Sequence, residues 1–357
     1  MHAIVKRDMY LMIIHASAPN RILDIGSWSA TAFAEHGAVL NCAVSLYARV
    51  TIRALRHGGT VVFGRQQAAA HDDVQCILSL DLSLSEFIRA AKHYFEIDGL
   101  EILVSSDLPS GYGTGTTAAV RVAMVAALAH VVGERLTPQR IALIAHRLQC
   151  EEVGLACGLQ SYLAAATGGL TLDRITPYPR VFNTHSVLAD PQLHALEQRC
   201  LIVQTGRRAS HNLYTLLEKR LQAGDRKVAE VIWRLRALPA RAMEAITQTD
   251  WETLGATMAE QWMLQLRLFP ALSTPEVRHI SHLASRYGAL ATMVNGSGGS
   301  VTILNARDDN SALRRELLAS GYHVLPVRIA RQGVSVRSTD PIRFRPPLPR
   351  CCASGMA

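Results

Sequence analysis

Short apolar segments rich in β-branched residues dominate the first third of the chain, at residues 11–16, 46–54, 60–63 and 100–104. Such segments predict strands, because apolar side chains on a strand need a buried face to pack against. Helical periodicity follows at residues 85–96 and 116–132. A third helix is predicted to begin with Thr137 as its N-cap and Pro138 in its first turn. The pattern therefore predicts strands with helices packed on them.

The second half of the chain orders its elements differently. After a predicted strand at residues 200–204, helical periodicity dominates residues 212–221, 227–247, 251–268 and 275–287. The closing section predicts strand, glycine-rich turn, strand, helix and strand, at residues 289–294, 295–300, 301–304, 310–320 and 323–329. This arrangement favours an α+β fold of two domains. We place them at residues 1–195 and 196–340, followed by a Pro/Arg-rich tail at residues 341–357 that we expect to be flexible.

Composition and charge argue against two classes of protein. The formal net charge is +8, and apart from Lys6, Lys92, Lys219 and Lys227 the basic residues are arginines. Arginine suits small anionic ligands, but no dense basic run is interleaved with aromatic residues, so we expect no nucleic-acid partner. The longest apolar run, residues 118–132, is interrupted by charge, and no N-terminal signal is evident. We therefore expect no membrane span and a cytoplasmic location.

The seven cysteines are scattered along the chain. They form no CxxC pair, and no histidine stands at a zinc-ligand spacing from them. We therefore expect reduced thiols in the core or on the surface.

A glycine-rich loop joins the predicted strand at residues 100–104 to the predicted helix at residues 116–132. It reads Asp-Leu-Pro-Ser-Gly-Tyr-Gly-Thr-Gly-Thr-Thr-Ala-Ala over residues 107–119. Glycines let the backbone approach an anion closely, and the N–H groups and dipole of the first helical turn favour negative charge there. The hydroxyls of Thr116 and Thr117 could hold phosphate or magnesium. The same glycines would also serve a tight turn without a ligand.

The helix that begins at Pro138 carries an apolar stripe that continues onto Glu151 and Glu152. These carboxylates either sit at a frayed, solvated helix end or hold a magnesium ion opposite Thr116 and Thr117. The stripe does not decide which glutamate would do so.

A second glycine turn, Asn-Gly-Ser-Gly-Gly-Ser at residues 295–300, lies between two predicted strands. By itself it is typical of a hairpin loop. Together with the first loop it predicts a cleft lined by small residues from both domains.

In this order the motifs resemble those of the GHMP kinases, the superfamily of galactokinase, homoserine kinase and mevalonate kinase. The opening motif is Pro-Asn-Arg-Ile-Leu-Asp-Ile-Gly at residues 19–26, running on to residues 37–41. Residues 109–119 are similar to the family's PxxxGLGSSAA motif, and residues 295–300 to its C-terminal glycine loop. Residues 151–169 resemble the stretch of galactokinase and heptose-phosphate kinases that carries the magnesium glutamate and the catalytic aspartate. Thr205-Gly206-Arg207 resembles the segment that opens the second domain of sugar 1-kinases.

The resemblance implies a fold, two cofactors and a set of site residues. The fold would combine an N-terminal domain like domain 2 of ribosomal protein S5 with a ferredoxin-like C-terminal domain, and the cofactors would be ATP and Mg²⁺. The implied metal ligands are Thr117 and Glu151, and the implied catalytic positions are Arg21 and Ser161. The implied nucleotide-binding residues are Pro109, Gly111, Gly113, Gly115, Thr116 and Thr117. The implied substrate-binding residues are Trp28, Ser29, His36, Asn41, Gly296, Ser297 and Gly298.

Two aspartates of the family pattern are replaced in this chain. The catalytic aspartate falls on Ser161, and the aspartate that would hold sugar hydroxyls falls on Ala30. Serine can orient a substrate by hydrogen bonding, but it cannot accept the hydroxyl proton of the substrate as a carboxylate can. A pocket without these charges, furnished with Arg21, Trp28 and His36, favours a more anionic or less hydroxylated acceptor.

Two functions remain open at this point. The first is an ATP-dependent kinase that phosphorylates a hydroxyl of a sugar, sugar phosphate or related metabolite, with the proton leaving late. The second is a nucleotide- or metabolite-binding homologue without kinase activity or with altered chemistry. Either function implies a nucleotide and a small molecule as partners, and either is compatible with a homodimer.

Overall fold

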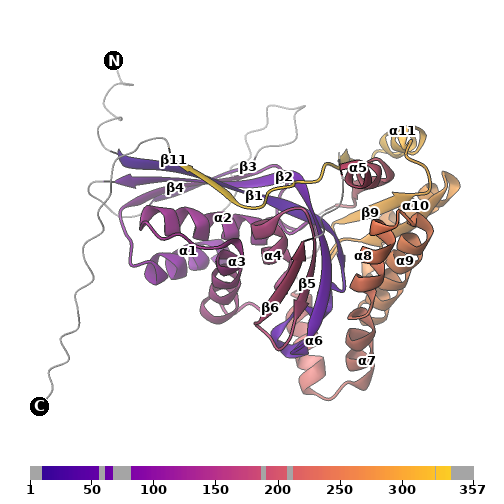
Figure 1. Ribbon diagram of the computed structural model, residues 1–357, viewed down its shortest axis with the longest axis horizontal. Helices are drawn as coiled ribbons and strands as arrows, with labels where there is room; N and C mark the ends of the chain where they lie inside the picture. The colour runs from indigo at the N-terminus through magenta and orange to yellow at the C-terminus, as the bar shows by residue number, and fades with distance from the viewer. Residues whose placement is uncertain are drawn as a thin grey trace, which may run out of the picture.

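Two β-sheets and the helices packed on them organise the computed structural model (Figure 1). The structure describes residues 10–55, 61–66, 82–185, 190–206, 212–325 and 327–338. Arg207 and the expected tail at residues 341–357 lie outside these ranges, as do Cys76, Cys351 and Cys352.

The first sheet is built on two long antiparallel strands, β1 (Tyr10–Ile25) and β2 (Gly37–Leu55). One end of β2 pairs with β4 and the other end pairs with β5. On the side away from β1, β2 therefore has two different neighbouring strands along its length. The strand order is β11-β1-β2-β4-β3, with β6 paired to β5. These strands are β3 (Val61–Gln66), β4 (Leu100–Ser106), β5 (Leu170–Ile175), β6 (Val181–His185) and β11 (Ser335–Ser338).

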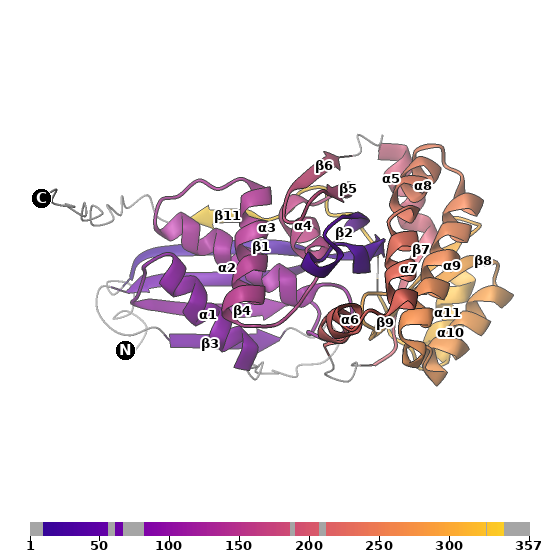
Figure 2. The same ribbon diagram turned by 90° about the horizontal axis from the view of Figure 1, so that it is seen from below.

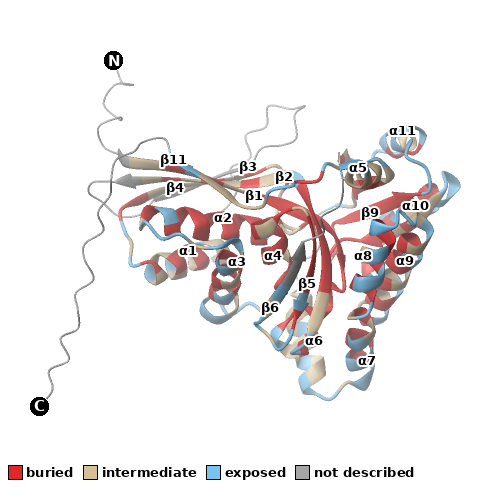
Figure 3. Ribbon diagram, viewed as in Figure 1, coloured by how far each residue is buried: buried red, intermediate tan, exposed pale blue. Residues whose placement is uncertain are grey.

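Four helices lie against one face of this sheet, as Figures 1 and 2 show. They are α1 (Leu82–Tyr94), α2 (Thr116–Val131), α3 (Pro138–Arg147) and α4 (Gln160–Thr167). Almost every residue of α2 is buried, because this helix is apolar on all sides and contacts β1, β2 and the other three helices (Figure 3). The central position of α2 fixes its N-terminus, and with it the glycine-rich loop.

The second sheet has the strand order β10-β7-β9-β8, and all neighbours are antiparallel. Counted along the chain this is the order 4-1-3-2, which confirms the expected ferredoxin-like arrangement. The strands are β7 (Cys200–Gln204), β8 (Ala289–Val294), β9 (Ser300–Asn305) and β10 (Val324–Leu325). The helices of this half are α5 (Asp190–Arg199), α6 (Leu213–Gln222), α7 (Arg226–Leu235), α8 (Leu238–Thr247), α9 (Trp251–Leu268), α10 (Pro275–Arg286) and α11 (Ser311–Ala319).

One sequence-based prediction is wrong, and two further features of the structure bear on the predicted division into domains. The helix predicted at residues 227–247 is two helices, α7 and α8, because the chain turns at Arg236 and restarts with Pro239 in the first turn of α8. Residue 195, the predicted domain boundary, lies inside α5. Strand β11, which falls in the second predicted domain, pairs with β1 of the first sheet.

None of the described helices combines the length and the apolar character that a membrane crossing requires.

The N-cap of α3 offers a direct test of the local structure. Thr137 Oγ1 accepts a hydrogen bond from the backbone N–H of Arg140. We expect Thr137→Ala to lower the free energy of unfolding by about 1 kcal/mol in urea denaturation, because the N–H group loses its partner. Thr137→Ser keeps the hydroxyl and should stay close to the wild type. Equal losses in the two variants would contradict the capping role.

Candidate functional site

A cavity of ≈ 380 Å³ lies where the N-terminus of α2 meets the second glycine loop. Both halves of the chain line it, since Asn212, Tyr214 and the glycine loop at residues 295–300 come from the second half. The site residues expected from sequence that line it are Arg21, Gly111, Gly113, Gly115, Thr116, Thr117, Ser161, Gly296 and Ser297. The structure therefore brings Arg21 of the opening motif and the glycine loop at residues 295–300 to the glycine-rich loop at residues 107–119.

The two glycine loops pack backbone against backbone. A Cβ atom on Gly113 would stand 2.7 Å from the carbonyl oxygen of Gly298, and one on Gly299 would stand 2.6 Å from Cα of Tyr112. In addition, Ser300 Oγ donates a hydrogen bond of 2.6 Å to the carbonyl oxygen of Tyr112. Only residues without a side chain permit this approach, so the glycines at these positions join the two halves of the cavity wall.

The N-terminus of α2 faces the cavity without a side-chain cap. Its N-cap, Gly115, has the left-handed φ of 81° and no hydrogen bond from a side chain closes the first turn. Strand β1 holds the loop in place: Asn20 Nδ2 donates to Thr116 Oγ1 at 3.0 Å, and the N–H of Arg21 donates to the carbonyl of Thr114 at 2.9 Å. The exposed Thr117 hydroxyl donates to Ser110 Oγ at 3.2 Å. The helix end is thereby left available to an anion.

Arg21 connects three parts of the site. Its Nε and Nη2 atoms donate to Ser161 Oγ at 3.2 and 3.1 Å, and Nη1 donates to the carbonyl of Gly113 at 2.9 Å. Nη2 also lies 3.0 Å from Oδ2 of Asp24, whose side chain is fully buried. Burial raises the pKa of Asp24, and the Arg21 guanidinium opposes that rise. The guanidinium is thus fixed rather than free to move.

Sequence reasoning missed Asp24. Residues three apart on a regular strand point to opposite faces, so Asp24 is not expected beside Arg21. A register shift between Ile22 and Ile25, with a positive φ of 53° at Leu23, turns Asp24 toward Arg21. Nothing in the local sequence predicts this bulge, since leucine rarely adopts a left-handed φ.

Arg121 is a second residue that sequence reasoning missed. It lines the cavity from α2, where Nη1 donates to the carbonyl of Thr117 at 3.1 Å and Nη2 donates to Ser83 Oγ at 3.3 Å. Its guanidinium lies over the ring of Phe87, with 5.3 Å between its carbon and the ring centroid. The signal was available, because Arg121 interrupts an apolar run one helical turn after Thr117.

The cavity carries positive charge without a facing carboxylate. Arg21 and Arg121 line it, and no aspartate or glutamate is among the described residues that do so. Together with the α2 N-terminus, these guanidinium groups favour a ligand with several negative charges.

Four of the expected substrate-binding residues do not line the cavity. Ser29 Oγ donates to the carbonyl of Gly26 at 2.8 Å, and Asn41 Nδ2 donates to Asp173 Oδ2 at 3.3 Å, both in the interior. His36 is exposed and lies 3.2 Å from Thr176 Oγ1. Trp28 is fully buried and packs on Tyr214, with 4.7 Å between ring centroids. Trp28 therefore positions a cavity residue rather than lining the cavity.

Three further expected positions also lie outside the lining. Pro109 and Gly298 belong to the two packed loops but do not face the cavity, and Glu151 is exposed on the π-helical segment η4 (Leu148–Glu152). Ala30, where the family pattern has an aspartate, is buried in the core, and its carbonyl accepts a hydrogen bond from the N–H of Leu159 at 2.8 Å. Of the two expected metal ligands, Thr117 alone lines the cavity.

The expectation for the cysteines was incomplete. Cys42, Cys150, Cys157 and Cys200 are free thiols, as expected. However, the structure brings Cys150 and Cys157 together with His146. The signal lay in the i, i+4 spacing of His146 and Cys150, which places both on one side of a helix.

Comparison with known protein families accounts for this arrangement. Residues 83–169 match the GHMP kinases N-terminal domain, and residues 242–323 match the GHMP kinases C-terminal domain. The chain belongs to the GHMP kinase superfamily. The first matched range of this GHMP kinase homologue contains the α2 loop, Arg121 and Ser161, and the second contains the glycine loop at residues 295–300.

Individual relatives are distant from this GHMP kinase homologue. It is 24% identical over 276 residues to a D-glycero-alpha-D-manno-heptose 7-phosphate kinase of Campylobacter jejuni, a match that covers 73% of this chain and 79% of the relative. It is 25% identical over 328 residues to a bifunctional fucokinase/GDP-fucose pyrophosphorylase of Arabidopsis thaliana. That match covers 84% of this chain but only 30% of the bifunctional protein.

A solved structure shares the fold. The crystal structure of a D-glycero-D-manno-heptose 1-phosphate kinase from Bacteroides thetaiotaomicron superposes with a TM-score of 0.70 at 17% identity. The alignment covers 91% of this chain and 98% of that chain.

The contact between the two glycine loops can be tested by Gly299→Ala. We expect the free energy of unfolding to fall by roughly 1–3 kcal/mol more than in Gly321→Ala, because the new methyl group meets backbone atoms that cannot yield. Gly321 is a matched control, since its φ of 83° is also positive but a Cβ there meets nothing within 4 Å. Equal losses in urea denaturation would show that backbone strain alone, and not the packing of the loops, explains the effect.

Proposed function

We propose that this protein is an ATP-dependent small-molecule kinase that transfers the γ-phosphate to a hydroxyl of an anionic sugar derivative or related metabolite. The observation that carries the proposal is the joining of both glycine loops at the uncapped N-terminus of α2, in a cavity lined by Arg21 and Arg121 but by no described carboxylate. The heptose 7-phosphate kinase and fucokinase relatives support a sugar or sugar phosphate as the acceptor class.

The loop and α2 would bind the phosphates of the nucleotide. The N–H groups of the first helical turn point to the cavity with the positive end of the helix dipole. Arg121 adds fixed positive charge one turn along the same helix. These groups stabilise negative charge that builds up on the transferred phosphoryl group, which is the main catalytic requirement of phosphoryl transfer.

Ser161 would act on the acceptor as a hydrogen-bond donor. Its Oγ already accepts from two nitrogen atoms of Arg21, so its remaining hydrogen-bonding capacity is its own proton. An aspartate at this position would instead accept a proton or hydrogen bond from the substrate. The site therefore favours an acceptor that presents an oxygen lone pair or an anionic oxygen to Ser161, while the hydroxyl proton leaves to the phosphoryl group or to water.

The residues present fit a magnesium ion in part. The Thr117 hydroxyl lines the cavity and is of the oxygen-donor type that Mg²⁺ prefers. Mg²⁺ keeps several waters and is usually bound through one or two carboxylates plus substrate phosphates, so the Thr117 hydroxyl alone does not complete the site. Glu151 remains a proposed ligand, and its carboxylate would have to turn from solvent toward the cavity.

A second candidate, a nucleotide- or metabolite-binding protein without phosphoryl transfer, is favoured by one observation. The only protein group that contacts Ser161 Oγ through described side-chain hydrogen bonds is the Arg21 guanidinium, which cannot accept a proton. A site of this kind binds an anion without needing a base.

Phosphoryl transfer and nucleotide binding can be measured separately. We expect Mg²⁺-dependent ATP binding by calorimetry and ADP release with at least one member of a panel of sugar phosphates, neutral sugars and hydroxy acids. Ser161→Ala should lower kcat/KM about tenfold with unchanged ATP affinity, because one hydrogen bond of about 1.4 kcal/mol is lost. Ser285→Ala, on the exposed surface of α10, serves as the control.

Three outcomes decide between the candidates. ADP release that depends on an acceptor supports the kinase. ATP binding without release across the panel contradicts the kinase and supports the binding protein. Absence of ATP binding contradicts both.

A further inference from the structure

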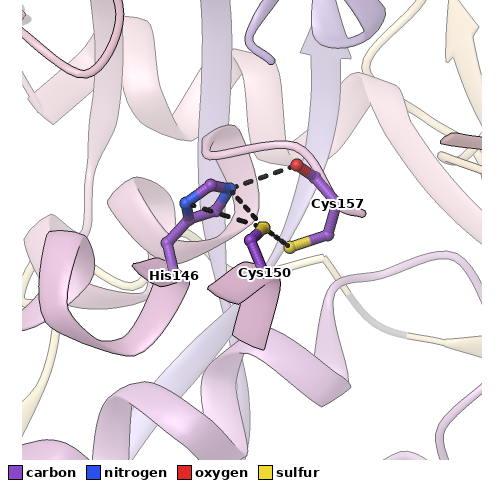
Figure 4. Close-up of side chains that lie close together, drawn as sticks. All are labelled: His146, Cys150 and Cys157. Carbon is purple, nitrogen blue, oxygen red and sulfur yellow. Dashed lines mark hydrogen bonds between the residues drawn. The ribbon is translucent and has the colours of Figure 1, made fainter. Parts of the chain in front are cut away.

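Beside the cavity, His146, Cys150 and Cys157 point toward one another (Figure 4). His146 comes from α3, Cys150 from the π-helical segment η4, and Cys157 from the extended segment before α4. Their ligand atoms all lie within 4.8 Å of one another, with 3.4 Å between the two Sγ atoms and 3.5 Å between Sγ of Cys150 and Nε2 of His146. None of these residues has a part in the proposed phosphoryl transfer.

We propose that His146, Cys150 and Cys157 form a binding site for a thiophilic divalent cation, zinc in the first place. Zinc is bound by thiolate sulfur at about 2.3 Å and imidazole nitrogen at about 2.0–2.1 Å in a tetrahedral arrangement. That geometry separates two sulfur ligands by about 3.8 Å, and a sulfur from a nitrogen ligand by about 3.6 Å. The two separations given above differ from these values by a few tenths of an ångström, and the third pair, Cys157 Sγ and a ring nitrogen of His146, lies within 4.8 Å. Side-chain adjustment therefore suffices to close the site on a metal ion.

The surroundings hold the imidazole in the orientation that such a site needs. Nδ1 of His146 lies 3.0 Å from the hydroxyl oxygen of Tyr178, and the ring of Tyr162 packs edge-on against the imidazole at 5.2 Å between centroids. Nε2 lies 3.1 Å from the carbonyl oxygen of Cys157, which can only accept, so Nε2 carries the proton in this structure and Nδ1 accepts from the Tyr178 hydroxyl. Zinc bound at Nε2 would take the place of that proton, and Nδ1–H would then donate to Tyr178. A hydrogen bond of this kind behind a metal-bound histidine fixes both the tautomer and the ring orientation. His146 itself is buried, so its rotation is restricted.

The donor atoms distinguish this site from a magnesium site. Thiolate and imidazole ligands select zinc and similar cations, whereas magnesium prefers oxygen ligands. Cys157 lines the nucleotide cavity, so a water molecule there can complete a set of four ligands. Bound zinc would tie η4, which carries Glu151, to the segment that leads to Ser161. The site would therefore stabilise one wall of the cavity without taking part in phosphoryl transfer.

Cobalt(II) and zinc binding to the full-length protein test this proposal. The protein is reduced, stripped with a chelator and titrated with cobalt(II), and zinc affinity is then measured by competition with a chromogenic chelator. We expect one metal ion per chain, with the thiolate-to-cobalt charge-transfer band and the intense visible bands of tetrahedral cobalt. Cys150→Ser and Cys157→Ser should each abolish the charge-transfer contribution of one sulfur and weaken zinc binding at least a hundredfold. Cys200→Ala, a buried cysteine in the core of the second half, should bind as the wild type does.

A milder variant keeps the test decisive if a cysteine variant does not fold. Tyr178→Phe retains all three ligands, and we expect it to weaken zinc binding roughly tenfold to a hundredfold, as is typical when the group behind a metal-bound histidine is lost. The proposal is overturned if the reduced wild-type protein gives no tetrahedral cobalt spectrum. It is also overturned if folded Cys150→Ser and Cys157→Ser bind zinc as the wild type does.

Discussion

The backbone contact between the two glycine loops is the constraint on which the rest of the site depends. The loops belong to different sheets, and they meet at distances that any Cβ atom on Gly113 or Gly299 would prevent. Their contact closes one wall of the cavity and places Gly296 beside Arg21 and the N-terminus of α2. Because α2 is buried on nearly all sides, the position of its N-terminus is set by the core of the first half. The position of the helix end and of the two loops is therefore fixed by packing rather than by flexible side chains.

Arg21 sets the charge and the hydrogen bonding on one side of the cavity. In this chain the guanidinium is paired with Asp24, a carboxylate buried behind it, while its other nitrogen atoms hold Ser161. Asp24 does not itself line the cavity, but at 3.0 Å from Arg21 it offsets part of the guanidinium charge. The serine at position 161, where the family pattern has an aspartate, removes negative charge from the space where an acceptor would lie. This favours an anionic acceptor over a neutral polyhydroxylated one.

Local signals made much of the fold predictable from the sequence. The bounds of β7, α9 and β8 agree with their apolar patterns, and the predicted N-cap Thr137 marks the start of α3. The glycine-rich loop at residues 107–119 was recognisable because its glycines precede an apolar helix. Features that depend on distant parts of the chain were not predictable. Strand β11 returns to β1 across more than three hundred residues of sequence, and no local pattern specifies that pairing.

The site residues also fall into two groups, those that a local motif predicts and those that depend on distant parts of the chain. The motifs predicted Thr117 and the glycines that line the cavity, whereas Asp24 reaches Arg21 only through a bulge at Leu23 that its sequence does not favour. Trp28 and Asn41 were expected at the substrate because the motif contains them, but packing places both in the interior. The i, i+4 spacing of His146 and Cys150 is visible in the sequence. The fold, and not the spacing, brings Cys157 to these two residues.

A crystal structure with Mg²⁺, a non-hydrolysable ATP analogue and a sugar phosphate tests the central claim most directly. We expect the triphosphate to lie between the two glycine loops at the N-terminus of α2, with an acceptor oxygen within hydrogen-bonding distance of Ser161 Oγ. A nucleotide bound away from these loops, or an acceptor that Ser161 does not contact, would contradict the assignment of this cavity as a phosphoryl-transfer site.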